Sequence, residues 1–125
     1  MHIDRIDHLV LTVADLERTV AFYTDVLGMT AETFGEGRTA LRFGRQKINL
    51  HVAGSEFEPR AARPGPGTTD FCLVTETPIE QVQAELAAHG VPVEVGPVTK
   101  QGALGAMRSV YLRDPDDNLV EISVY

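Results

Sequence analysis

The chain has 125 residues, enough for one ordinary domain whose core needs no disulfide to hold it together. Eleven basic residues stand against eighteen acidic ones, a formal net charge of −7, which excludes the basic surface that a nucleic-acid or anionic-membrane partner requires. A single cysteine, no apolar run long enough to span a membrane and no apolar leader at the first residues together predict a cytoplasmic protein.

The first half of the chain predicts the element order β-α-β-β-β. The apolar, β-branched run at 8–13 is typical of a strand. Asp15 is a good helix N-cap, and apolar residues then recur at spacings of three and four as far as Leu27, with Gly28 in the position of a C-cap glycine. Three further strands, separated by turns that contain glycine, are expected near 30–34, 39–43 and 47–52.

The second half predicts the same order after a connector rich in glycine and proline. A strand is expected at 70–75, followed by a helix that begins in a capping box at 77–80 and ends at Gly90. The segment 114–118, Asp-Pro-Asp-Asp-Asn, is a strong turn signal. The remaining strands are expected near 92–98, 107–113 and 119–125.

The shared order of elements indicates an internal repeat. His8 and Asp70 both open a strand, and Gly28 and Gly90 both end a helix, in each case 62 residues apart. We therefore expect one domain made of two modules, which we place, with the segment between them, at 1–52 (module one), 53–67 (linker) and 68–125 (module two).

The last strand of each module extends the comparison. His51 and Glu121 lie in these strands, 70 residues apart, which makes the second module longer by eight residues. We place the extra residues at 101–105, Gln-Gly-Ala-Leu-Gly, as a mobile lid or a hairpin loop.

Strand alternation places four polar side chains on the sheet face that the helices do not cover. Apolar neighbours in each strand take the helix side, so the polar residues face the other way. Two imidazoles and two carboxylates gathered there would be unfavourable without a cation, because desolvated carboxylates repel each other. Zn, Ni, Co, Fe or Mn would remove that cost. The predicted ligands, each of which is otherwise an ordinary strand-end surface group, are His8, His51, Asp70 and Glu121.

Three segments carry a resemblance to a known family: DHLVLTVADLERTVAFYTDVLGM at 7–29, FGRQKINLH at 43–51 and YLRDPDDNLVEIS at 111–123. They resemble the vicinal oxygen chelate superfamily, which includes glyoxalase I, bleomycin-resistance proteins and extradiol dioxygenases. The segment FEPRAARPGPGTTD at 57–70 is similar to the glyoxalase-domain-containing protein 5 subgroup and to related bacterial virulence-associated proteins.

The resemblance implies an α+β fold in which paired βαβββ modules form a cup-shaped mixed sheet around a divalent metal. It implies metal ligands at His8, His51, Asp70 and Glu121, in a site built from two modules within one chain or across a homodimer. Asp70 stands where extradiol dioxygenases have histidine, which argues against ordinary ring cleavage. Thr12 stands where glyoxalase I usually has an arginine that contacts glutathione, which argues against glutathione as the thiol.

The function we expect is a glyoxalase-type lyase or isomerase reaction on a small oxygen-chelating substrate. The metal would stabilise a developing enolate or alkoxide, with Glu121 as the first candidate for general base and Asp70 as the second. A metal-dependent dioxygenase, and a resistance protein that binds a small molecule without turnover, stay open as alternatives. We expect a homodimer with a small-molecule partner and with no nucleic acid or membrane partner.

Other residues have weaker roles in this hypothesis. Cys72 shares the metal face by alternation but is expected to be a small buried thiol. Met107, Ser109 and Tyr111 share one face of their strand and are candidates for lining a pocket. Four arginines could bind an acidic substrate group or simply be solvated: Arg60, Arg63, Arg108 and Arg113.

Overall fold

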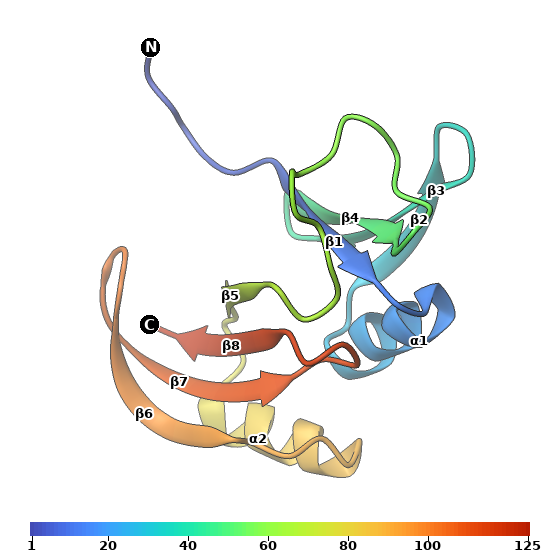
Figure 1. Cartoon of the computed structure of the whole chain (residues 1–125). Helices are drawn as coiled ribbons and strands as arrows, with labels where there is room; N and C mark the ends of the chain where they lie inside the picture. The colour runs from blue at the N-terminus through green and yellow to red at the C-terminus, as the bar shows by residue number, and fades with distance from the viewer. The chain divides into compact units, whose positions relative to one another are not determined.

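The computed structural model describes all 125 residues, which form two compact units, Met1–Thr68 and Thr69–Tyr125 (Figure 1). Each unit holds one four-stranded mixed sheet and one helical segment, in the order β-α-β-β-β. The α+β class and the paired βαβββ order predicted from the sequence are therefore confirmed. No helix is long and apolar enough to cross a membrane.

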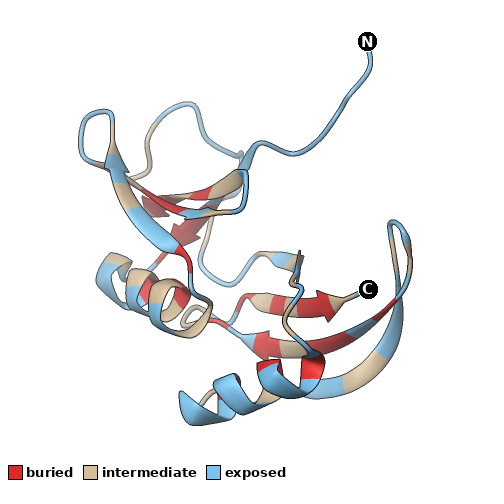
Figure 2. Cartoon of the chain, turned by 180° about the vertical axis from the view of Figure 1, so that it is seen from behind, coloured by how far each residue is buried: buried red, intermediate tan, exposed pale blue.

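The sheet of the first unit has the strand order β1-β4-β3-β2. β1 and β4 are parallel, and the other pairs are antiparallel. Its core consists of apolar side chains from the strands and of Tyr23, all fully buried or nearly so, whereas the residues before β1 are exposed (Figure 2). The elements are β1 (His8–Val13), α1 (Leu16–Ala21), η1 (Phe22–Val26), β2 (Thr30–Phe34), β3 (Arg38–Phe43) and β4 (Gln46–Val52).

The helical segment of the first unit begins as predicted and changes pitch halfway. The Asp15 side chain accepts a hydrogen bond from the backbone N–H of Arg18 at 3.1 Å, which satisfies one of the free donors of the first turn. After Ala21 the segment continues as the π-helix η1, which presents Tyr23 to the core. Gly28, at φ 70°, then ends the segment in the left-handed conformation that glycine adopts without strain.

The sheet of the second unit has the equivalent order β5-β8-β7-β6, again with its first pair parallel. Its helix packs on β7 and buries one apolar stripe, which is formed by Ile79, Val82 and Leu86. The elements are β5 (Asp70–Val74), α2 (Ile79–Ala88), β6 (Val95–Gly102), β7 (Gly105–Arg113) and β8 (Leu119–Val124).

The start of α2 differs from the prediction. The N-cap is Pro78, which offers no side-chain hydrogen bond, so the predicted capping box is wrong. The reason is local, because the backbone N–H of Thr77 donates to the hydroxyl of Thr75 at 3.1 Å, and this turn carries the chain one residue further before the helix begins.

Of the two alternatives predicted for the segment 101–105, a mobile lid or a hairpin loop, the structure has the hairpin. The strands pair as far as Gly102 and Gly105, which leaves only two residues in a tight hairpin. A side chain at Gly102 would collide with the Tyr125 hydroxyl and the Met107 sulfur. The same hydroxyl accepts a hydrogen bond from the backbone N–H of Leu104 at 3.1 Å. The extra residues of the second half therefore lengthen a strand ladder.

The predicted turn at 114–118 is confirmed. The Asp114 carboxylate accepts hydrogen bonds from the backbone N–H groups of Asp116 and Asn118 and from the Asn118 side-chain amide, at 2.8–3.0 Å. The Asn118 side-chain oxygen accepts the backbone N–H of Thr69 at 3.0 Å, which ties this turn to the residue before β5. The turn thus sets where β5 starts beside β8.

Candidate functional site

Strand register decides which residues of the two units correspond to each other. In the first unit Val10 pairs with Asn49, and Thr12 pairs with His51. In the second unit Cys72 pairs with Glu121. His8 and Asp70 are the first residues of equivalent strands. Val10 and Cys72, each two residues later, therefore correspond to each other, and so do their pairing partners Asn49 and Glu121.

The predicted equivalence of His51 and Glu121 is therefore wrong, and the position that corresponds to His51 is Ser123. The error is a shift of two residues. Alternation has a period of two, so such a shift leaves every side chain on its predicted face and cannot be detected from the sequence pattern.

His8 lies on the predicted face of β1 and is partly exposed. Its Nδ1 and the Asp7 Oδ1 are 2.8 Å apart, and this hydrogen bond holds the pKa of the Asp7 carboxyl below its usual value. Because an ionised carboxylate only accepts, the proton of neutral His8 resides on Nδ1. The Nε2 lone pair is then available to a metal, in the carboxylate–histidine arrangement common to metal sites.

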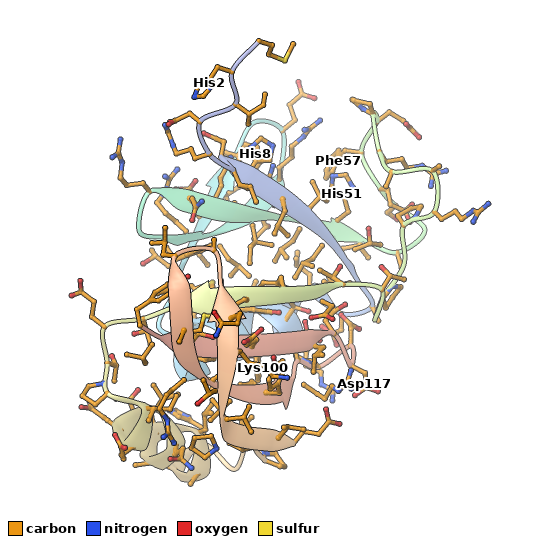
Figure 3. The ribbon with its side chains drawn as sticks, turned by 90° about the vertical axis from the view of Figure 1, so that its left-hand side faces the viewer. His2, His8, His51, Phe57, Lys100 and Asp117 are labelled. Carbon is orange, nitrogen blue, oxygen red and sulfur yellow. The ribbon has the colours of Figure 1, made fainter.

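His51 shares the face of His8 but lies four residues farther along the β1–β4 ladder, about 13 Å at the usual strand rise. It is buried, and its ring meets the Phe57 ring edge to face at 5.5 Å between centroids (Figure 3).

Asn49 lies between the two histidines, on the same face and only two positions from His8 in register. Its Oδ1 is buried and has no hydrogen-bond partner, which is costly for an amide oxygen. An unpaired amide oxygen is a suitable ligand for a hard cation. Strand alternation puts Asn49 on the same face as His51, two residues away, but an asparagine in a strand gives no sign in the sequence that its amide oxygen will lack a partner.

Glu121 is the centre of a polar cluster in the second unit. The Ser123 hydroxyl donates to its Oε1 at 3.3 Å, and the Ser109 hydroxyl lies 2.7 Å from that of Ser123. Burial raises the pKa of the Tyr111 phenol, and its hydrogen bond to Glu121 raises that pKa further. β7 and β8 bring these side chains together, because Ser109 pairs with Ser123 and Tyr111 pairs with Glu121. The pocket-lining role of Ser109 and Tyr111 stays a prediction, and Ser109 is fully buried.

Cys72 lies directly across the β5–β8 ladder from Glu121. Contrary to the prediction of a buried thiol, the residue is exposed, with its Sγ 3.1 Å from the Ser123 Oγ. Partial desolvation raises the pKa of this thiol, and the negative charge of Glu121 adds to the rise. Cys72 is thus a protonated neighbour of Glu121 at neutral pH.

Asp70 occupies the exposed start of β5, opposite Leu119 and two residues from Cys72 on the same face. The structure thus places His8 and His51 on one face of the first unit, and Asp70 and Glu121 on one face of the second. No group of three His, Cys, Asp or Glu side chains is gathered as a metal cluster. The four-ligand set stays a prediction.

Comparison with known proteins identifies the family. The model of the Glyoxalase/Bleomycin resistance protein/Dioxygenase superfamily matches residues 5–122. The virulence protein STM3117 of Salmonella typhimurium is 55% identical over 125 residues, which are 100% of this chain and 87% of that protein. The crystal structure of STM3117 superposes with a TM-score of 0.99, covering 100% of this chain and 99% of that one.

Two other relatives extend the comparison. The glyoxalase domain-containing protein RDO1 of Mycosarcoma maydis is 52% identical over 120 residues, which are 96% of this chain and 68% of that protein. The lactoylglutathione lyase of Agrobacterium tumefaciens is 25% identical, with a TM-score of 0.75 and coverage of 98% of this chain and 95% of that one. The family match covers 118 of the 125 residues and extends over both units, so this chain belongs to the Glyoxalase/Bleomycin resistance protein/Dioxygenase superfamily.

Proposed function

We propose that the chain is a divalent-metal-dependent enzyme that carries out a lyase or isomerase reaction of the glyoxalase type on a small molecule with two neighbouring oxygens. The observation that carries the proposal is the Asp7–His8 hydrogen bond, which leaves one imidazole nitrogen available on the face that bears the other candidate ligands of that unit. The similarity to a lactoylglutathione lyase agrees with this class of reaction.

The proposed ligands are His8, His51, Asp70 and Glu121, with Asn49 as a competitor of His51. The donor chemistry fits a divalent ion, because imidazole and carboxylate suit Zn, Ni, Co, Fe and Mn alike. Asn49 competes because it is the register equivalent of Glu121 and its buried oxygen has no partner.

A metal bound by these residues would supply Lewis-acid stabilisation of the negative charge that develops on a substrate oxygen. The remaining work falls to the side chains. Glu121 accepts the substrate proton as general base, with Asp70 as the second candidate. The hydroxyl of Ser123, itself held by Ser109, fixes the orientation of the Glu121 carboxylate. The phenol of Tyr111 donates to the same carboxylate, which keeps it in place between turnovers.

A second candidate function is a resistance protein that binds a small molecule without turnover. Apolar side chains on the same faces as the candidate ligands favour it, since Val10 is 44% exposed and Val74 is 59% exposed. A dioxygenase is the third candidate, and oxygen uptake by the Fe(II)-loaded protein would distinguish it from the other two.

The test is elemental analysis of protein purified without chelators, together with variants. We expect stoichiometric divalent metal in the wild type and its loss in the double variant His8→Ala/Glu121→Gln, with His89→Ala as the control. Separate His51→Ala and Asn49→Ala variants identify which of the two residues is a ligand, because only the ligand's loss weakens metal binding. Absence of metal from the native protein would overturn the enzyme in favour of the non-catalytic binder.

We further propose that the protein works in the cytoplasm as a homodimer. A lone exposed thiol is compatible with a reducing compartment. Large apolar side chains are exposed in both units, among them Ile6 at 64% and Leu104 at 86%, as expected of surfaces that a second copy covers.

A further inference from the structure

Arg38 is the only one of the nine arginines of the chain that is partly buried. It makes no ion pair, although the chain has eighteen acidic residues, and the four other arginines without an ion pair are all exposed. Two of the exposed arginines, Arg60 and Arg113, were candidates for binding an acidic group, but they pair with Glu58 and Glu94. A partly desolvated guanidinium without a counter-ion is an arrangement that an anion would stabilise.

The guanidinium of Arg38 is held in place by an aromatic ring. Its central carbon lies 4.5 Å from the centroid of Phe57, and Phe57 in turn packs edge to face against His51. Figure 3 shows Phe57 and His51 as neighbours. The Arg38 side chain makes no hydrogen bond within the chain, so the N–H donors of its planar guanidinium are available for two parallel hydrogen bonds to a carboxylate or phosphate.

The loop that carries Phe57 is fixed independently of Arg38. The Glu56 carboxylate accepts the backbone N–H of Gly54 at 3.0 Å, and hydrogen bonds from the backbone lower the pKa of this carboxyl. The Glu56 carboxylate is thus hydrogen-bonded to the backbone of its own loop, and it makes no ion pair with Arg38. The result is a positioned and unneutralised cation.

Strand register places Arg38 on the face of the candidate ligands of its own unit. Ala40 pairs with Asn49, so Arg38, two residues from Ala40, lies on the face of Asn49. Thr39 pairs with Leu50, so Arg38 lies at the end of the β3–β4 ladder that is nearer to His51. Arg38 and Ala40 are two residues apart, about 7 Å along the strand. At this separation, one small molecule can lie beside the unpaired Asn49 oxygen and also contact the Arg38 guanidinium.

We propose that Arg38, stacked on Phe57, binds an anionic oxygen group, a carboxylate or a phosphate, of the substrate. The substrate class is then a small organic acid or phosphate ester that also carries the oxygen pair. The link to a substrate rests on the proposed function, whereas anion binding at Arg38 does not require a metal.

The experiment is an NMR titration of the full chain with inorganic phosphate and, separately, with acetate. We expect saturable shifts of the Arg38 side-chain N–H and of the Phe57 backbone amide, and the anion that binds more tightly identifies the group. Arg38→Gln should weaken binding by about tenfold or more, and Arg38→Lys by less, since lysine keeps the charge but loses the planar fork. Arg45→Gln, which removes an exposed and unpaired arginine, should bind as the wild type does.

The inference is wrong if neither anion shifts the Arg38 signals, or if folded Arg38→Gln or Arg38→Lys protein binds both anions as tightly as the wild type. Repeating the titration with and without Zn²⁺ separates the two proposals. Anion binding at Arg38 in a protein that takes up no metal overturns the proposed enzyme alone. Metal binding without anion binding overturns the role of Arg38 alone.

Discussion

Asp7 and His8 are adjacent in sequence, yet their side chains meet in a hydrogen bond at the exposed start of β1. The bond chooses the tautomer of the imidazole, because the pKa of Asp7 is lowered and the carboxylate can only accept. Asp7 would thus position a metal ligand without touching the metal. Such outer partners of ligating histidines commonly strengthen metal binding.

Replacing Asp7 by Asn should weaken metal binding about 10- to 100-fold while leaving the fold intact. The amide keeps the size of the side chain but removes the charge that supports the imidazole. Competition with a chromogenic chelator measures the affinity, and Asp4→Asn is the control, because Asp4 pairs with Arg5 instead. Equal affinities for the two variants would show that Asp7 does not act on a ligand.

The turn between β7 and β8 is the element in which the sequence motif and the structure agree most fully. Both Asp114 and Asn118 are buried, at 4% and 1% exposure, and the side chain of each accepts a hydrogen bond from a backbone N–H group. Asp117, the one non-glycine residue with a positive φ, makes the reversal possible. The turn at 114–118 therefore aligns β8, and with it Glu121.

Asn118→Ala should lower the free energy of unfolding by about 2–3 kcal/mol, because it removes the hydrogen bond from the side-chain amide to the Asp114 carboxylate and the acceptor of the Thr69 backbone N–H. Chemical denaturation of the variant beside the wild type measures the loss. Asp117→Gly, in the same turn, should cost little or be favourable, since glycine adopts a positive φ without strain. A loss of similar size in both variants would contradict the role given to the Asn118 side chain.

At the scale of the whole molecule, the two units share one plan with different polar residues at corresponding places. His8 corresponds to Asp70, Asn49 to Glu121 and His51 to Ser123. The repeat thus supplies two versions of one face. The first carries imidazoles and a stacked arginine, and the second carries carboxylates supported by hydroxyl groups.

Light scattering on the purified chain should give about twice the monomer mass of 13.6 kDa, because the apolar side chains exposed in both units would otherwise meet water. The measurement is repeated at two protein concentrations to distinguish a stable dimer from a weak one. A mass equal to that of one chain at both concentrations would rule the homodimer out.

Prediction from the sequence succeeded for most of the local signals. The alternation of side chains along the strands correctly places His8, Asn49 and His51 on one face, and glycine and proline residues mark the turns. It failed at the capping box of α2, where the Thr75 hydroxyl takes the N–H of Thr77. Sequence analysis also did not identify Arg38 as a candidate, because nothing in the sequence of β3 indicates that its guanidinium will lie over the ring of Phe57, nineteen residues later.

By itself the sequence determined the element order, the repeat and the side of the sheet on which each polar residue lies. These depend on periodicity, capping and turn chemistry, which act within a few residues. Only the tertiary structure decided that Asn49 and not His51 corresponds to Glu121, and that Arg38 is held without a counter-ion. The physical reason is that register and stacking join residues distant in the chain, and a two-residue shift leaves every local pattern unchanged.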